Sequence, residues 1–268
     1  MSLFSNTLQV IRHYLSNSVG DLLYGVCGTT GADTTNTYAP FLWEADDYYN
    51  EQFYEVYVYA GTNIGLTRRV TDWDLSAFLL TVHSAYTVAC DATSYAELHY
   101  IFTEDEYRKA INLAIENAAT KYLIDKIDTT ITLVSDIHEY TLPTDMSHVH
   151  KITTEQTAGD GKFNESDVID PRDWRLISPR KLKLDEGTYS VTAGKDLRIE
   201  GHGRQDIVTS DTDIISLPPD WLVQKAITFL PYNKVQSNAL DATYRQALIL
   251  SANEPRNSPH TESRKVVE

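Results

Sequence analysis

The chain is poor in cysteine, with only Cys27 and Cys90 among its 268 residues. Two cysteines are too few for a disulfide framework or a structural zinc site, so we expect both to be buried, reduced thiols. The chain also has no apolar run near the roughly 20 residues that span a bilayer. Its N-terminus lacks the pattern of a signal peptide. We therefore expect synthesis in a cytoplasm and no membrane partner.

Basic residues are scarce as well. The chain has 23 Lys and Arg residues against 38 Asp and Glu, which gives a formal net charge of −15. Tight non-specific binding to DNA or to an anionic membrane needs cationic side chains that displace counterions. An acidic surface lets DNA pass without being gripped. We expect no sequence-specific DNA binding.

Motifs of common active sites are missing too. There is no G-x-S-x-G, H-E-x-x-H or P-loop motif. Residues 201–206 (GHGRQD) resemble a phosphate loop only superficially, and we predict a β-turn there. His148 and His150 share one face of an expected strand, but spacing places no third metal ligand, so an exposed pair is the better interpretation. The sequence predicts no catalytic, cofactor-binding or metal-binding residue and no enzyme.

One acidic segment leaves an alternative open. Glu44, Asp46, Asp47 and Glu51 lie close together in the sequence. Paired carboxylates can serve glycoside hydrolysis or bind calcium, although the EF-hand pattern is absent. A glycan hydrolase that uses Asp46 and Asp47 therefore remains a lesser hypothesis beside an acidic surface loop.

The residues that are abundant indicate a globular, β-rich protein. Hydrophobic residues make up 42%, enough for a core, and the 17 tyrosines outnumber the 7 phenylalanines and 4 tryptophans together. Tyrosine suits half-buried β surfaces and interfaces, because its ring is buried while its hydroxyl keeps a hydrogen bond.

Apolar periodicity predicts three helical segments, at 1–17, 103–127 and 218–250. The central one is the best specified, because Thr103 and Glu106 form a T-x-x-E capping box. Pro231 must break or kink the last segment, since proline lacks an amide donor.

Short apolar runs separated by turn residues predict strands over 19–100 and 130–217. The clearest are Phe53–Tyr59, Gly65–Thr71, Phe78–His83 and Tyr95–Tyr100. We predict an α+β fold in which a small framework of N-terminal, central and C-terminal helices carries two β-rich modules that resemble sandwiches or barrels. The predicted segments are a helix at 1–18, a β module at 19–100, a core at 101–230, and a helical arm with a polar tail at 231–268.

Two sets of motifs carry a family likeness. The first joins the helix at 104–127 to 140–145 (YTLPTD), and 214–221 (IISLPPDW) enters the C-terminal helix. The second, at 46–71, has the form D-D-x-Y…G-x-x-x-G-x-x-R-x-V-T. Their order resembles the head-to-tail adaptor, or neck, proteins of tailed bacteriophages, over most of residues 20–230. The departure is the inserted β module, which many smaller adaptors lack.

The resemblance implies a structural virion protein of the neck rather than an enzyme. Such adaptors form homo-oligomeric rings, commonly of twelve copies, beneath the portal protein. They present a surface to the tail or to a further neck protein, and genomic DNA passes through the central channel. A ring needs a heterologous interface that closes on itself.

The resemblance also implies that the C-terminal arm binds the portal. The expected partner interface consists of Tyr232, Leu240, Tyr244, Leu248 and Pro255. An alternative is another virion binding module, such as a tail or decoration protein whose β domain binds a receptor or glycan.

Overall fold

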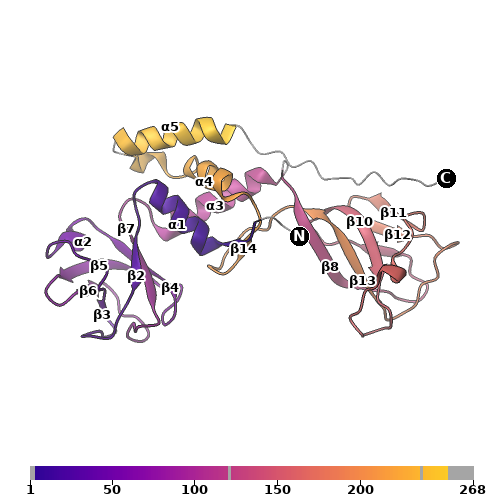
Figure 1. Ribbon diagram of the computed structural model, residues 1–268, viewed down its shortest axis with the longest axis horizontal. Helices are drawn as coiled ribbons and strands as arrows, with labels where there is room; N and C mark the ends of the chain where they lie inside the picture. Colours follow the sequence, from indigo (N-terminus) through magenta and orange to yellow (C-terminus); the bar gives the residue numbers. More distant parts are fainter. Residues whose placement is uncertain (1–3, 120–121, 236–237, 253–268) are drawn as a thin grey trace. The chain divides into compact units, whose positions relative to one another are not determined.

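The computed structural model describes residues 4–119, 122–235 and 238–252. The fold is α+β, with helices and antiparallel sheets that form two β-rich modules, as predicted. Contacts between Cα atoms divide the described residues into a larger unit, 4–115 and 207–252, and a smaller unit, 116–206. Figure 1 shows the elements of both.

In the larger unit, α1 (Leu8–Ser18) begins after Thr7, whose hydroxyl accepts a hydrogen bond from the amide of Val10 at 3.3 Å. This bond satisfies one of the amides that a first helical turn leaves free. The helix predicted at 1–17 therefore begins later, because the residues just before it form β1 (Asn6–Thr7), which pairs with β14 (Ile214–Ile215).

The central helix α3 (Glu104–Ala118) has the predicted capping box. The amide of Thr103 donates to Glu106 at 2.9 Å, and the amide of Glu106 donates to the hydroxyl of Thr103 at 3.3 Å. The predicted helix end at 127 is wrong, because residues from Ile124 belong to strand β8 (Ile124–Thr132). That segment is rich in β-branched residues, which favour strands, and it pairs along its length with β13.

One six-stranded antiparallel sheet forms the first β module. Its order is β2-β7-β4-β5-β6-β3, and an isolated bridge between Gly28 and Tyr38 links the segment after β2 to β3. The sheet thus curls into a half-barrel. Its strands are β2 (Leu23–Val26), β7 (Tyr95–His99), β4 (Glu55–Ala60), β5 (Thr67–Asp74), β6 (Leu79–Val82) and β3 (Asn36–Tyr38).

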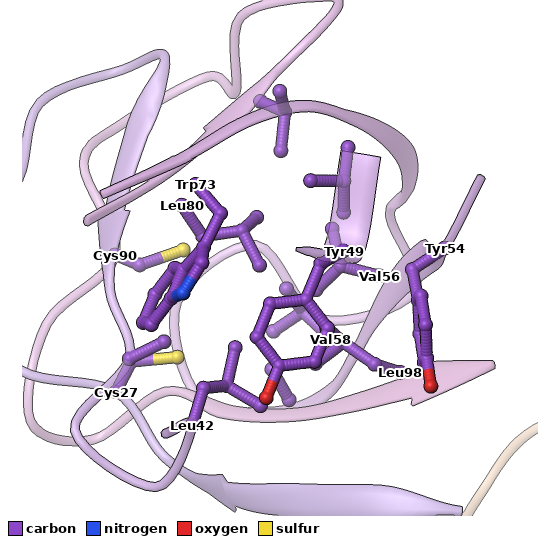
Figure 2. Close-up of a cluster of buried hydrophobic side chains, with 14 of the residues drawn as sticks. Cys27, Leu42, Tyr49, Tyr54, Val56, Val58, Trp73, Leu80, Cys90 and Leu98 are labelled. Atoms are coloured by element: carbon purple, nitrogen blue, oxygen red, sulfur yellow. The ribbon is translucent and has the colours of Figure 1, made fainter. Parts of the chain in front are cut away.

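The core of this module is rich in aromatic rings (Figure 2). Tyr49, in the short helix α2 (Tyr48–Glu51), meets Tyr54 and Trp73 edge to face, with ring centroids 5.2 and 5.3 Å apart. Such geometry is favourable for aromatic pairs. Cys27 and Cys90 are free and buried in the same core, as expected from the sequence.

The smaller unit has two three-stranded antiparallel sheets, in the orders β10-β13-β8 and β11-β12-β9. They enclose one apolar core, which includes Leu142, Ile152, Leu184 and Ile199. The strands besides β8 are β9 (Glu139–Thr141), β10 (Met146–Thr154), β11 (Trp174–Ser178), β12 (Lys181–Leu184) and β13 (Asp196–Gly203).

The β-turn predicted at 201–206 is wrong for its first half, because Gly201, His202 and Gly203 lie in β13. The two glycines are required by close backbone approach. A Cβ at Gly201 would lie 1.9 Å from the carbonyl oxygen of His148, and one at Gly203 would lie 1.9 Å from that of Asp145. Glycine within a strand often marks such an approach.

The C-terminal helices are α4 (Pro219–Ile227) and α5 (Asn238–Ala252), and they pack on one another. The chain leaves the helical path before Pro231, so the predicted break is confirmed. Among the helices formed by the described residues, none is long and apolar enough to cross a membrane.

Candidate functional site: a buried ion cluster beside an acidic pocket

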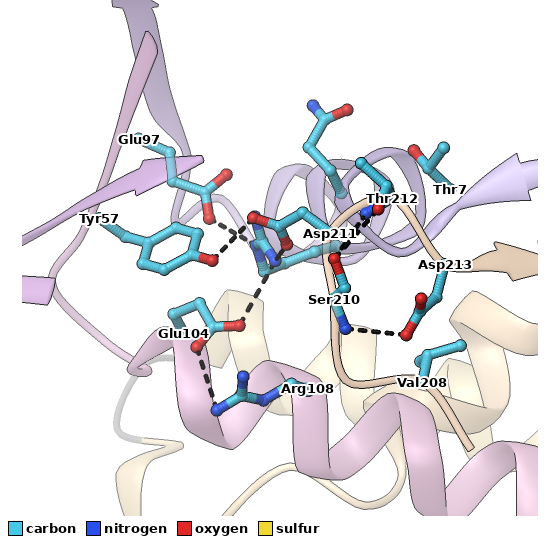
Figure 3. A network of polar contacts seen from close by, with 12 residues as sticks. Thr7, Tyr57, Glu97, Glu104, Arg108, Val208, Ser210, Asp211, Thr212 and Asp213 are labelled. Atoms are coloured by element: carbon cyan, nitrogen blue, oxygen red, sulfur yellow. Dashed lines mark hydrogen bonds and ion pairs between the residues drawn. The ribbon is translucent and has the colours of Figure 1, made fainter. Parts of the chain in front are cut away.

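The densest group of charges in the larger unit surrounds Arg12 of α1, whose side chain is fully buried. Its Nε donates to Glu97 of β7 at 2.5 Å, and its Nη1 lies 3.4 Å from Glu104 of α3. Nη1 also donates to Asp211, which precedes β14. One cation therefore joins a helix, a strand, a second helix and a loop. Figure 3 shows Glu97, Glu104 and Asp211 converging on this point.

A short loop places Asp211 in this cluster. The carboxylate of Asp213 accepts hydrogen bonds from the amides of Thr209 and Ser210, at 2.7 and 2.8 Å, which fixes the turn. The backbone carbonyl of Asp211 then accepts a bond from the amide of Gln9 at 3.3 Å. The loop thus caps α1 and holds its own carboxylate beside the next turn of the same helix.

Glu97 is shared between Arg12 and two histidines. Its Oε2 lies 2.5 Å from Nε2 of His13, and its Oε1 lies 3.3 Å from Nε2 of His99. The second contact is an ion pair rather than a well-aligned hydrogen bond. Burial alone would raise the pKa of Glu97, but the charge of Arg12 and the two histidines bring it well below its usual value.

His99 is in turn held by Asp21, which follows α1. The ring nitrogen Nδ1 of His99 lies 2.6 Å from the carbonyl oxygen of Asp21, and the Tyr107 hydroxyl donates to the Asp21 carboxylate at 2.7 Å. The same carboxylate also accepts bonds from the amides of Tyr100, Ile101 and Phe102. Asp21 therefore satisfies the backbone where β7 leads into α3.

A pocket of about 460 Å³ lies beside this cluster, lined by residues that include Tyr57, Glu104, Arg108 and Ser210. The hydroxyl of Tyr57 donates to Asp211 at 2.7 Å. Burial raises the pKa of Glu104, and the positive charges of Arg12 and Arg108 partly offset this rise. A pocket lined by carboxylates and hydroxyls can accept hydrogen bonds from a ligand or bind a cationic group. Within the described chain, no group of three or more His, Cys, Asp or Glu residues is arranged to hold a metal ion.

The residues singled out in the sequence lie elsewhere. His148 is exposed, whereas His150 meets His202 of the neighbouring strand, with ring centroids 4.2 Å apart. Of the expected exposed pair, only His148 is therefore exposed, and His150 is partly buried in a cross-strand contact. His148 is itself the register partner of His202, and the register is irregular between Val149 and Lys151.

The acidic segment of the first β module is an exposed, structured loop. Asp46 accepts a hydrogen bond from the amide of Leu75 at 2.7 Å, and Asp47 accepts one from the side chain of Asn50 at 3.0 Å. These two carboxylates fix the loop around α2. Glu44 and Glu51 are exposed as well.

The expected partner-interface residues divide between surface and interior. Tyr232 and Leu248 are exposed, Tyr244 is partly buried, and Leu240 of α5 is only 6% exposed. Tyr232 and Tyr244 lie close, with ring centroids 5.1 Å apart. Pro255 lies outside the described residues.

Sequence reasoning missed the ion cluster and two exposed apolar residues of α5, Ile249 and Leu250. One signal for the cluster was present, since Arg12 falls within the apolar stripe of α1, between Ile11 and Leu15. A charged residue there needs buried partners. No local pattern, however, indicates that Asp211 is one of them.

Neither a scan of protein-family models nor a search of curated proteins finds a match to this sequence.

Proposed function

We propose that the chain is a structural virion protein of a tailed bacteriophage. As a head-to-tail adaptor, it forms a homo-oligomeric ring, with twelve copies expected, beneath the portal. The ring connects the capsid to the tail or a further neck protein, and genomic DNA passes through it without sequence-specific binding. The proposal rests on the order of the adaptor-like motifs and assigns the chain no enzyme activity.

One structural observation supports it. The C-terminal end of α5 exposes Leu248, Ile249 and Leu250 consecutively, with Ile249 70% exposed. The opposite side of α5, which includes Ala247 and Ser251, is buried. Adjacent exposed apolar residues on a helix favour a docking surface. They lie in the arm that the resemblance assigns to the portal.

The test is to measure the mass of the purified chain with and without its portal protein. A closed ring of about a dozen subunits on the portal is expected. Ile249→Asp should weaken portal binding at least tenfold, because it places a charge in an apolar contact. Gln246→Asp, an exposed position on the same helix, is the matched control. A wild-type chain that stays monomeric with its portal would contradict the proposal.

A second candidate, a virion module that binds a glycan, is favoured by the side chains of Trp43 and Phe53. They are 78% and 65% exposed in the first β module. Exposed aromatic rings offer flat apolar faces to a ligand. Binding to a glycan array that Trp43→Ala abolishes, together with no binding to the portal, would support this candidate over the adaptor.

A further inference from the structure

The hairpin of β11 and β12 in the smaller unit carries an unusual concentration of positive charge. Residues 172–183 contain five cationic side chains and one acidic side chain, in a chain of net charge −15. Arg172, Arg175 and Arg180 are exposed, and within the described part of the chain their side chains have no hydrogen bond or ion pair. These cations are available to a partner.

Two cations of the hairpin oppose one another directly. Arg175 of β11 is the register partner of Lys183 of β12. Like charges placed opposite each other destabilise an antiparallel pair. Glu186 and Glu139 offset part of the repulsion, since they lie 3.1 and 3.9 Å from Lys183. An incoming carboxylate between Arg175 and Lys183 would remove the rest.

The same two residues line a pocket of about 350 Å³, together with Arg172, Trp174 and two carboxylates, Asp185 and Glu186. The indole nitrogen of Trp174 is buried and has no acceptor among the described residues. Trp and Arg are the side chains most enriched at the energetic centres of protein interfaces. Its three cations outnumber its two carboxylates, so the pocket suits a carboxylate-bearing protein segment.

β11 also lies at the edge of its sheet, in the order β11-β12-β9. Leu176 and Ile177 on this strand are 40% and 43% exposed. An edge strand has unpaired backbone groups, and natural proteins usually protect such an edge. The hairpin thus presents exposed apolar side chains beside its unpaired arginines.

A surface of opposite charge is present in the first β module. Residues 43–53 contain four acidic side chains, those of the segment Glu44–Glu51, and no cation. Within the described residues no Lys or Arg pairs with any of them. Trp43, Tyr48 and Phe53 are exposed large apolar side chains of this segment, and the guanidinium of Arg69 lies 4.8 Å from the ring centroid of Phe53.

We infer that the hairpin 172–183 of one copy binds the acidic segment 43–53 of a second copy. Both surfaces combine unpaired charge with exposed apolar side chains, and their charges are complementary. Because the two surfaces differ, the contact is heterologous, and repetition closes a ring or extends a filament. The inference rests on the proposed ring and names its subunit interface.

Charge reversal on each surface tests the contact. Arg175→Glu with Arg180→Glu, and separately Glu44→Lys with Glu51→Lys, should each weaken self-association at least 100-fold. Sedimentation in 0.05 M salt measures the effect. The variant with all four substitutions should recover assembly in part, because opposite charges again face each other at the four exchanged positions, while each segment as a whole becomes neutral. Raising the salt to 0.5 M should weaken the wild-type contact.

The controls are Lys109→Glu with Arg245→Glu, two cations that are 70% and 73% exposed in their side chains. They should leave assembly unchanged, and circular dichroism should show that every variant is folded. If the wild-type chain assembles and neither reversal weakens it, this inference is overturned and the proposed ring stands. If both reversals weaken assembly and the fourfold variant fails to recover, the two surfaces are not partners. A chain that stays monomeric with and without its portal overturns both proposals.

Discussion

Arg12 is a buried cation that depends on carboxylates far from it in the sequence. Its partner Glu97 is fully buried as well, and Asp211 is nearly so. Taking such charges out of water costs several kcal/mol for each ion, and their mutual attraction offsets this cost only while all partners are present. The cluster is therefore sensitive to the loss of any single member.

Arg12→Met should destabilise the larger unit by about 3–5 kcal/mol, because it leaves the carboxylates of Glu97 and Asp211 buried without their cation. Urea unfolding, followed by tryptophan fluorescence, measures the change. Arg245→Met, at an exposed position of α5, is the matched control and should change stability by less than about 0.5 kcal/mol. A loss below 1 kcal/mol for Arg12→Met would show that the cluster tolerates the missing charge.

His99 should make stability depend on pH. Burial alone would lower its pKa, but the neighbouring Glu97 and Asp21 raise it above the ordinary 6.5. A raised folded-state pKa contributes stability that is fully present below 6.5 and is lost as the pH rises through the folded-state value. The stability advantage of the wild type over His99→Gln should therefore be larger at pH 6 than at pH 9. Urea titrations of both proteins measure it, and an advantage that is constant or grows with pH would contradict the assignment.

At the scale of elements, the sequence predicted a helix or strand correctly where the residues that determine it are neighbours in the chain. The capping box at Thr103, the break at Pro231 and the strands around Val56 and Leu80 all follow from neighbouring residues. The failure at 122–127 has a physical cause. Tyr122 continues the apolar stripe of the helix there, but pairing with β13, where Gly203 is the register partner of Ile124, makes Ile124 begin a strand.

The candidate site was harder to predict from the sequence, because its residues too are distant from one another along the chain. Arg12 and Asp211 are 199 residues apart, and their meeting depends on the loop that caps α1. The acidic segment at Asp46 was visible in the sequence. Its hydrogen bond to the amide of Leu75 was not, because that bond crosses between loops.

The capping box offers a prediction for a single element. Thr103→Ala should cost about 1 kcal/mol of stability, because the amide of Glu106 loses its acceptor at the start of α3. Thr103→Ser keeps the hydroxyl and should lose less than half as much. Chemical denaturation measures the difference, and hydrogen exchange should show faster exchange of the first amides of α3 in the alanine variant. Equal losses for both variants would mean that the hydroxyl does not act as a cap.

At the scale of the whole molecule, the described residues of the smaller unit all come from the stretch 116–206, and they have their own core. The larger unit is discontinuous, since it resumes at residue 207. The two ends of the smaller unit meet in one ladder, where Ile124 of β8 is the register partner of Gly203 of β13. Neighbouring ends allow a segment to be excised without strain in the chain that remains.

A fragment of residues 122–206 should therefore fold alone, with dispersed amide resonances and a cooperative thermal transition. In the reciprocal variant, a short Gly/Ser linker replaces residues 120–206, and the larger unit should keep the buried cluster around Arg12. The matched control is a fragment of equal length, residues 100–184, which lacks β13, the central strand of the order β10-β13-β8. This control should remain unfolded, because neither flanking strand has another partner in that sheet. If 122–206 is also unfolded, the smaller unit depends on the rest of the chain for its stability, and its separate core is not sufficient.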